Sequence, residues 1–170
     1  AVFGMEEMKW SSIQKDMMEY DVTMPYIRMM AGPVDYTPGA MRNASKKDFK
    51  DIYYNPMSQG TRCHQLAAYV VHDSPLTMLA DNPTIYKREQ ECTDFIISIP
   101  NKGIEETRVL QGKVGESIIM ARRAGTSWYI GGMTDWTARE ITLDFDFLDN
   151  GNYEVILFKD GINADKQAED

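Results

Sequence analysis

Residues 61–97 read TRCHQLAAYVVHDSPLTMLADNPTIYKREQECTDFII, and this stretch decides the fold. Its first part, from Thr61 to His72, predicts a helix, because apolar side chains recur on one face at helical spacing. Ser74-Pro75 ends that helix, since proline cannot continue it. Leu76–Ala80 is a short apolar run of the kind that forms a buried strand. Asn82-Pro83 then predicts the start of a second helix, with asparagine as its N-cap.

The same order of elements extends toward the N-terminus. Thr23–Gly32 holds an apolar run closed by Gly32-Pro33, and we expect Tyr26–Ala31 to form a buried strand that starts just after Pro25. A short helical turn is expected at Ser45–Lys50, within a long loop. Strand, helix, strand and helix in this order are typical of a parallel sheet or barrel.

A hairpin pattern follows Asn101-Lys102-Gly103. Strands are predicted at Ile118–Arg122 and Trp128–Gly132, joined by a tight turn at Ala124-Gly125. From this point on, alternation of polar and apolar residues replaces the helical pattern. We therefore expect a boundary here, with an α/β unit over residues 1–100 and an antiparallel β domain over residues 101–170.

Two further strands are predicted in the β domain. Glu140–Phe147 alternates acidic or polar residues with apolar ones, which indicates a strand with one face in water. Asn150-Gly151 predicts a turn into a last strand, Tyr153–Phe158. Asp160-Gly161 predicts another turn whose partner strand is missing, so the β domain is expected to be incomplete.

Composition excludes some classes of protein. The chain has 170 residues, 43% of them hydrophobic, and a net charge of −8. An acidic chain is a poor match for nucleic acid, because phosphate contacts need clustered lysine and arginine. No apolar run is long enough to span a membrane. The start lacks both an initiator methionine and a signal peptide, and the end stops without a closing strand, so we expect a chain truncated at both ends.

Four stretches together resemble glycoside hydrolase family 97, which contains α-glucosidases and α-galactosidases. The first stretch, Ala1–Glu6, matches the tail of a glutamate-containing loop motif of the family. The most specific match is the long run that ends in Ala31–Gly39. The resemblance covers essentially the whole chain, and its four stretches are Ala1-Val2-Phe3-Gly4-Met5-Glu6, Tyr20–Gly39, Gly60–Ala67 with Ser74–Asp81, and Gly131-Gly132-Met133-Thr134-Asp135-Trp136.

The resemblance implies a fold and an activity. The family has an N-terminal β-sandwich, a central (β/α)8 TIM barrel and a C-terminal antiparallel β domain. This chain would hold about strands seven and eight of the barrel with their helices, followed by an incomplete β-sandwich-like domain. Tyr26–Ala31 would be strand seven and Leu76–Ala80 strand eight. The enzyme would hydrolyse terminal α-linked glucose from oligosaccharides, with galactose as the alternative.

A non-catalytic role is the other alternative. The chain could be a β module for structural support or carbohydrate binding that carries a remnant of a barrel. Two strands cannot close an eight-stranded barrel, so we expect the isolated chain to be inactive. The resemblance also implies a periplasmic or secreted protein, and it leaves the oligomeric state open.

Glu6 occupies the position of the family's general acid, which protonates the departing glycosidic oxygen. The resemblance also makes Glu6 a candidate ligand of calcium, a cofactor held by oxygen atoms and here expected to have most of its ligands outside this chain. Direct coordination would lower the pKa of this carboxyl, whereas a general acid needs it raised. The residue pattern alone favours a simpler interpretation, in which Glu6 and Glu7 are solvated loop acids.

Four residues are candidates for substrate binding. Asp35 and Tyr36 follow the expected strand seven and Asp81 follows strand eight, so all three would lie on the catalytic face of a barrel. Trp10 is close to Glu6 and is the best candidate for stacking on a sugar ring. The alternative for Asp35 and Asp81, which we favour from the residues alone, is that they cap loops beside Pro33 and Pro83.

The remaining reactive side chains have simpler interpretations. Cys63 and Cys92 are read as small buried thiols, although a disulfide between them is an open alternative in an oxidising compartment. His64 and His72 are read as satisfied helix residues. Their spacing with the cysteines fits no usual zinc site.

Overall fold

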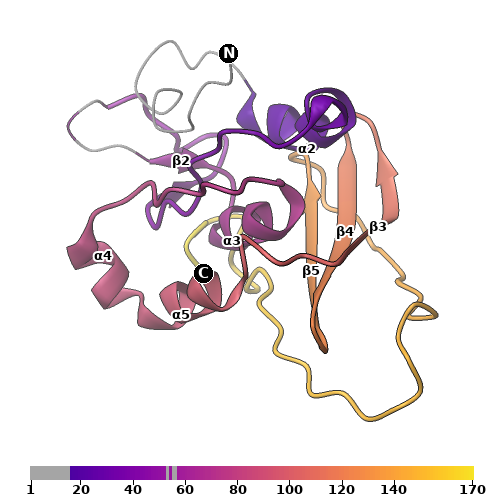
Figure 1. Cartoon of the computed structure of the whole chain (residues 1–170). Helices are drawn as coiled ribbons and strands as arrows, with labels where there is room; N and C mark the ends of the chain where they lie inside the picture. Colours follow the sequence, from indigo (N-terminus) through magenta and orange to yellow (C-terminus); the bar gives the residue numbers. More distant parts are fainter. Residues whose placement is uncertain (1–15, 53, 55–56) are drawn as a thin grey trace.

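The computed structural model describes residues 16–52, 54 and 57–170, and it combines helices with two small sheets. The elements are α2 (Met17–Ile27), the 3-10 helix η1 (Met29–Ala31), β1 (Asn43–Ala44), β2 (Ser58–Gln59), α3 (Arg62–Val71), α4 (Pro83–Arg88), α5 (Gln90–Ser98), β3 (Glu106–Lys113), β4 (Ser117–Ala124) and β5 (Ser127–Thr134). Helices α2 and α3 pack on the sheet β3-β4-β5, and α4 and α5 lie on the other side of α3 (Figure 1).

Helix α3 confirms the helix predicted at Thr61–His72. The Thr61 side chain caps its start by accepting a hydrogen bond from the backbone N–H of His64, at 3.2 Å. Asn82 caps α4 in the same way, with Pro83 in the first turn as expected. The single helix predicted after Pro83 is in fact two, because Glu89 leaves the helical conformation between α4 and α5.

The strand predicted at Tyr26–Ala31 is wrong, because this stretch forms the end of α2 and the 3-10 helix η1. Pro25 lies inside α2, where its missing N–H leaves the carbonyl of Asp21 without its usual partner. The ring of His72 replaces that partner, with Nε2 3.1 Å from the Asp21 carbonyl oxygen. The contact with His72, from a distant part of the chain, thus compensates for a proline inside a helix. Proline in a sequence otherwise indicates the end of a helix.

Residues 34–38 and 73–80 run side by side in parallel. The N–H of Val34 donates to the carbonyl of Asp73 at 2.8 Å, Tyr36 pairs with Thr77 in a parallel bridge, and the N–H of Ala80 donates to the carbonyl of Pro38 at 3.1 Å. The segment predicted as strand eight therefore has a parallel neighbour. That neighbour, residues 34–38, starts eight residues after Tyr26, where strand seven was predicted to start. A complete barrel is not seen in the described part of the chain.

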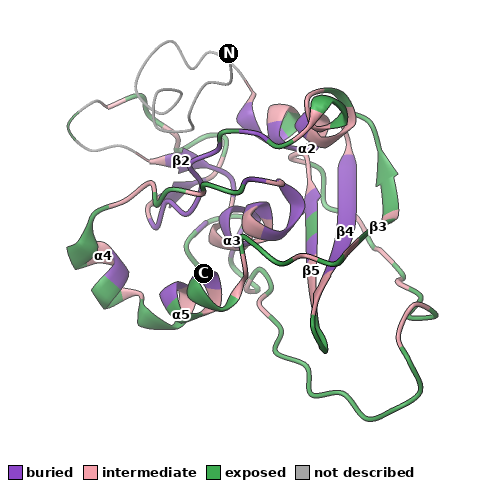
Figure 2. Cartoon of the chain, in the orientation of Figure 1, coloured by how far each residue is buried: buried purple, intermediate pink, exposed green. Residues whose placement is uncertain are grey.

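The antiparallel sheet confirms the predicted hairpin. Strand β4 lies between β3 and β5, and Ala121 pairs with Arg108 on one side and Ile130 on the other. Gly125 makes the turn with a φ of +58°, a conformation that glycine adopts without strain. Residues of β4 are almost all buried, as the purple central arrow in Figure 2 shows.

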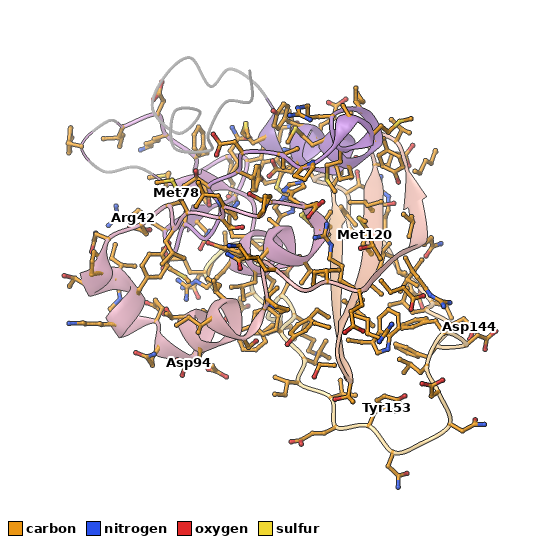
Figure 3. The ribbon with its side chains drawn as sticks, in the orientation of Figure 1. Arg42, Met78, Asp94, Met120, Asp144 and Tyr153 are labelled. Atoms are coloured by element: carbon orange, nitrogen blue, oxygen red, sulfur yellow. The ribbon has the colours of Figure 1, made fainter. Side chains whose placement is uncertain are left out.

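The two later strands predicted in the β domain are absent from the described structure. Glu140–Phe147 and Tyr153–Phe158 lie in a long segment without strand pairing. Figure 3 shows Tyr153 on this segment, where it extends away from the sheet. The ring of Phe147 meets that of Trp128 edge-on with centroids 4.8 Å apart, whereas Ile156 is 75% exposed. The alternation identifies the apolar face correctly for Phe147, but a strand also needs a neighbouring backbone, and none is paired here.

One hydrophobic core joins the helices to the sheet. It contains side chains from α2, from residues 34–36, from α3 and from β4 and β5, among them Met17, Val22, Tyr36, Ala68, Val71, Ile118, Met120 and Met133. Met120 points from the sheet toward the helices in Figure 3. This shared core fixes the parallel segments relative to the antiparallel sheet. The division of the chain at residue 100 stays a prediction.

We expect Gly131→Ala to destabilise this junction. A Cβ at Gly131 would meet the Ala67 carbonyl oxygen and the Val70 Cβ at 2.8 Å each, so α3 would have to move off β5. Overpacking of this kind costs about 1–3 kcal/mol. Gly132→Ala is the matched control, because its Cβ would meet the nearest atom, of Ile119, at an ordinary 3.5 Å. Chemical denaturation of both variants checks the difference, and equal stabilities would contradict the close packing of α3 on β5.

Candidate functional site

Glu6 and Trp10 lie outside the described residues, so their predicted roles as general acid, calcium ligand and stacking platform stay predictions. Asp35, Tyr36 and Asp81 are described. The structure places Asp35 and Tyr36 in the first of the two parallel segments and Asp81 directly after the second. The predicted strand boundaries implied that all three residues follow a strand. Two of them, Asp35 and Tyr36, instead lie within a strand-like segment.

Asp35 and Tyr36 point to opposite sides of the parallel pair. Tyr36 is 1% exposed and belongs to the core under α2 and α3, whereas Asp35 is exposed. On the neighbouring segment Leu76 and Met78, which flank the bridged Thr77, are 71% and 51% exposed. Side chains alternate between the two faces of a strand, so Asp35, Leu76 and Met78 share the open face opposite the helices.

Asp81 ties the ends of the two segments together. One carboxylate oxygen accepts a hydrogen bond from the backbone N–H of Met41 at 3.0 Å, and the other accepts from that of Asn82 at 3.1 Å. The Tyr86 hydroxyl donates to the Gly39 carbonyl at 2.7 Å and accepts from the backbone N–H of Asp81 at 3.0 Å. These contacts are those of a loop cap, the interpretation favoured from the residues alone. A contact of Asp81 with sugar stays a prediction.

A buried polar network lies on the helix side of the pair. The Tyr36 hydroxyl donates to one carboxylate oxygen of Asp21 at 2.8 Å, and Nε2 of His64 lies 3.0 Å from the other. Asp21 is 1% exposed, His64 5% and His72 3%. Burial is the largest cause of the raised pKa of Tyr36, so this hydroxyl stays protonated and can donate. Asp21 is thus held as an acceptor at the centre of the core.

This network was not predicted as a unit. His64, within α3, is hydrogen-bonded, as expected, whereas His72, at the end of that helix, has a partner at Nε2 but none at its buried Nδ1. Asp21 was not singled out. A signal exists in the sequence, because Asp21 precedes Pro25 by four residues and so carries the carbonyl that proline leaves unpaired. The network holds Tyr36, and through it the segment that carries Asp35. We interpret it as a positioning element and not as a set of reacting groups.

The network makes stability depend on pH. Burial lowers the pKa of His72 from 6.5 to about 4. Between those two values the unfolded chain binds the proton more readily than the folded chain, so stability is present above pH 6.5 and is lost as the pH falls toward 4. The loss attributable to His72 is about 3 kcal/mol. Thermal denaturation from pH 7 to pH 4 checks it, with His72→Gln as the matched variant; equal slopes for both proteins would remove His72 from this role.

A cavity of about 830 Å³ lies where the helices meet the C-terminal segment. Its aromatic lining comes from Phe95, Phe158 and Trp136. The Trp136 ring N–H donates to Asp16 at 2.8 Å, which joins the end of β5 to the start of α2. The cavity lining comes chiefly from α3, β5 and the C-terminal segment, and none of it from residues 34–38 or 73–80, so the cavity is distinct from the open face that carries Asp35.

The described residues contain neither a cluster of metal ligands nor a membrane-spanning helix. Among residues 16–52, 54 and 57–170, no group of three or more histidine, cysteine, aspartate or glutamate side chains is arranged to hold a metal ion. The expected calcium ligand, Glu6, lies outside these ranges. No helix in the described ranges has the length and apolarity needed to cross a bilayer.

Comparison with known proteins gives consistent matches. The family described as "Glycosyl-hydrolase 97 C-terminal, oligomerisation" matches residues 103–170. A "Retaining alpha-galactosidase" of Bacteroides thetaiotaomicron is 54% identical over 169 residues, which is 99% of this chain and 25% of that protein. A "Probable retaining alpha-galactosidase" of Streptomyces bingchenggensis is 26% identical over 94% of this chain and 23% of its own length. The chain thus spans about a quarter of these curated relatives.

Solved structures show the same relationship. A glycoside hydrolase family 97 enzyme in complex with acarbose, from Pseudoalteromonas sp. strain K8, superposes with a TM-score of 0.65 and 35% identity. The superposition covers 78% of this chain and 20% of that one. A β-arabinopyranosidase matches with a TM-score of 0.58 at 24% identity, which indicates a similar fold only.

Proposed function

Because this chain belongs to glycoside hydrolase family 97, we propose that it forms part of an α-galactosidase that removes terminal α-linked galactose from oligosaccharides. The observation that carries the substrate is the 54% identity to a retaining α-galactosidase over almost the whole chain. The resemblance stated from the sequence implies an α-glucosidase, with the galactosidase as the alternative. The higher identity to the galactosidase than to the enzyme solved with acarbose supports the alternative.

The proposed contribution of this chain is the last part of a catalytic barrel. The parallel pairing of residues 34–38 with residues 73–80, with helices on one face and an open face on the other, supports this placement. Strands of a barrel carry helices outside and substrate-binding groups at their carboxyl ends. The ends of the two segments, near Gly39 and Asp81, would then face the sugar. Two strands cannot enclose a site, so the chain alone would be inactive.

The proposed chemistry depends on Glu6 as general acid. A retaining mechanism, as the relative's name states for that protein, uses a second carboxylate about 5 Å from the acid. That second group would come from outside this chain. Calcium held by Glu6 through a longer or indirect contact, together with ligands from outside the chain, is part of the same proposal. Trp10, Asp35, Tyr36 and Asp81 are proposed to line or support the sugar site.

The C-terminal part of the chain is proposed to mediate contact between copies of the protein. This rests on the description of the family that matches residues 103–170. The apolar side chains exposed on the long segment, among them Val155 at 78% and Leu157 at 71%, are suitable for burial in such a contact. A periplasmic or secreted location belongs to the proposal as well. The non-catalytic carbohydrate-binding module stays the second candidate.

A chimera tests the proposed substrate. The segment of the Bacteroides thetaiotaomicron relative that aligns with this chain is replaced by these 170 residues. We expect kcat/KM for an aryl α-galactoside to exceed that for the matching α-glucoside by at least about 100-fold, because a site built to hydrogen-bond one hydroxyl rejects its epimer. A preference for glucoside would overturn the galactosidase proposal. Heat of binding of galactose to the chain alone would favour the binding module.

A further inference from the structure

Cys63 and Cys92, neither of which is used in the proposed function, lie in the first turns of two helices that start side by side. Arg62 opens α3, and its guanidinium forms an ion pair with the carboxylate of Glu89, the residue that precedes α5, at 2.9 Å. Cys63 follows Arg62 directly, and Cys92 is one turn beyond Glu89. The ion pair thus fixes the two cysteine-bearing turns at the same end of the helix pair.

The helices stay close beyond this point. Residues of α3 and α5 approach to Cα separations of 8 Å or less. Leu66, one turn after Cys63, packs in the same hydrophobic cluster as Cys92 and Phe95. Cys63, Leu66 and Phe95 also line one cavity. Disulfides join Cα atoms that are about 4.4–6.8 Å apart, a range that two helices in such contact can reach.

The two thiols also influence each other electrostatically. Burial raises the pKa of the Cys63 thiol to about 12, and the nearby Asp160 and Cys92 add to the rise. Burial raises the pKa of the Cys92 thiol as well, and the positive charge of the Arg62 guanidinium opposes that rise. Both cysteines are free and partly exposed, so a reagent can reach them. The Arg62 guanidinium acts on both thiols, but the pKa of Cys63 is raised more strongly, so Cys92 is the thiol that loses its proton more readily.

We propose that Cys63 and Cys92 are a redox pair that closes to a disulfide between α3 and α5. A disulfide-class oxidant such as oxidised glutathione supplies the two oxidising equivalents. The Cys92 thiolate attacks one sulfur of the oxidant, forms a mixed disulfide and releases one glutathione thiolate. Cys63 then loses its proton to the released thiolate, and its sulfur attacks Cys92, which displaces the second glutathione. The protein dithiol is oxidised and one disulfide of the oxidant is reduced to two thiols.

The bond would tie α3, which holds the loop at Gly39, to α5, which directly follows α4, the other helix that holds this loop. Gln65 of α3 accepts a hydrogen bond from the backbone N–H of Gly39 at 3.1 Å, and Tyr86 of α4 donates to its carbonyl at 2.7 Å. Closure of a loop of about 30 residues stabilises a protein chiefly by constraining its unfolded state. The oxidised chain is therefore more resistant to heat than the reduced chain.

Oxidation of the whole chain with glutathione disulfide tests the pair. We expect peptide mapping without reduction to recover a linked pair of peptides carrying Cys63 and Cys92. We also expect no disulfide between separate chains. We expect the Tm to rise by roughly 5–10 °C and to return when dithiothreitol is added. Two alkylated thiols after oxidation, a stable glutathione adduct on Cys92, or only disulfides between chains would each overturn the pair.

A matched variant separates the bond from general effects of the oxidant. Cys63→Ser keeps a small side chain at the position but removes the sulfur that closes the bond. We expect oxidised Cys63→Ser to retain glutathione on Cys92 and to show no rise in Tm. If the Tm of oxidised Cys63→Ser rose as much as that of the unaltered chain, the rise would not depend on Cys63. That result would overturn the proposed Cys63–Cys92 pair. The mapping on the unaltered chain stands by itself if this variant does not fold.

Discussion

Glu6→Gln, introduced into the chimera with the Bacteroides thetaiotaomicron relative, is expected to lower kcat for an alkyl or sugar α-galactoside by about 10²–10⁴-fold. Such leaving groups depart as strongly basic alkoxides unless an acid protonates the bridging oxygen. Glutamine has nearly the same shape but no proton of suitable acidity to give. A dinitrophenyl galactoside has a leaving group stable as an anion, so its turnover is expected to fall far less. Steady-state kinetics on the two substrates measure the difference.

Glu7→Gln is the matched control, because it removes the neighbouring carboxylate without touching the proposed acid. We expect it to leave both substrates within about threefold of the unaltered chimera, in line with the small effects of solvated surface groups. Equal losses on both substrates in Glu6→Gln would remove Glu6 from the acid role. A change within about threefold in both variants would favour the interpretation of two solvated loop acids.

Asp21→Ala is expected to destabilise the chain by about 3–5 kcal/mol, the range seen when one partner of a buried polar network is removed. The change leaves the Tyr36 hydroxyl and Nε2 of His64 facing an apolar core without the carboxylate that both contact, at 2.8 and 3.0 Å. Asp21→Asn keeps one oxygen acceptor, so a smaller loss is expected. Chemical denaturation followed by circular dichroism measures both.

Asp149→Ala serves as the control for that series, because Asp149 is an exposed aspartate on the long C-terminal segment. Its loss is expected to stay within about 0.5 kcal/mol. A comparable stability for Asp21→Ala and Asp149→Ala would show that the Asp21 network does not support the core. The Tyr36 ring, which meets the His72 ring edge-on at 4.1 Å, would then have to be held by packing alone.

Local signals predicted the elements whose stability is local. Asn82-Pro83 as a helix start and Ala124-Gly125 as a hairpin turn both act within a few residues, and the structure contains each of them. The strand predicted at Tyr26–Ala31 depended on Pro25 as a boundary, but Pro25 lies inside α2. The Asp21 carbonyl that this proline leaves unpaired meets His72, 51 residues away along the chain. No pattern around Pro25 alone carries that information.

The β domain shows a second limit. Alternation in Glu140–Phe147 indicates which side chains share a face, and Phe147 does pack on Trp128. Alternation does not show which neighbouring strand would pair with this stretch. Among the described residues, no strand pairs with it. The exposure of Val155 and Leu157 follows from the same absence of a neighbour.

The candidate site was predicted only in part for a related reason. Asp35, Tyr36 and Asp81 were placed by position relative to strands, and a shift of the first strand to residues 34–38 put Asp35 and Tyr36 on opposite faces. A one-residue step along a strand changes the face, so an error in strand bounds changes which residue can meet a substrate. Asp21 required knowledge of the fold, because it meets Tyr36 and His64 only after α2 and α3 pack together.

The most direct measurement is turnover of an aryl α-galactoside by three proteins: the chimera, the relative without the replaced segment, and the 170-residue chain alone. We predict turnover by the chimera and by neither of the other two proteins, because residues 34–38 and 73–80 are proposed to complete a site that neither part forms by itself. A folded chimera without turnover would contradict the proposal that this chain completes a glycosidase. Turnover by the chain alone would contradict it as well.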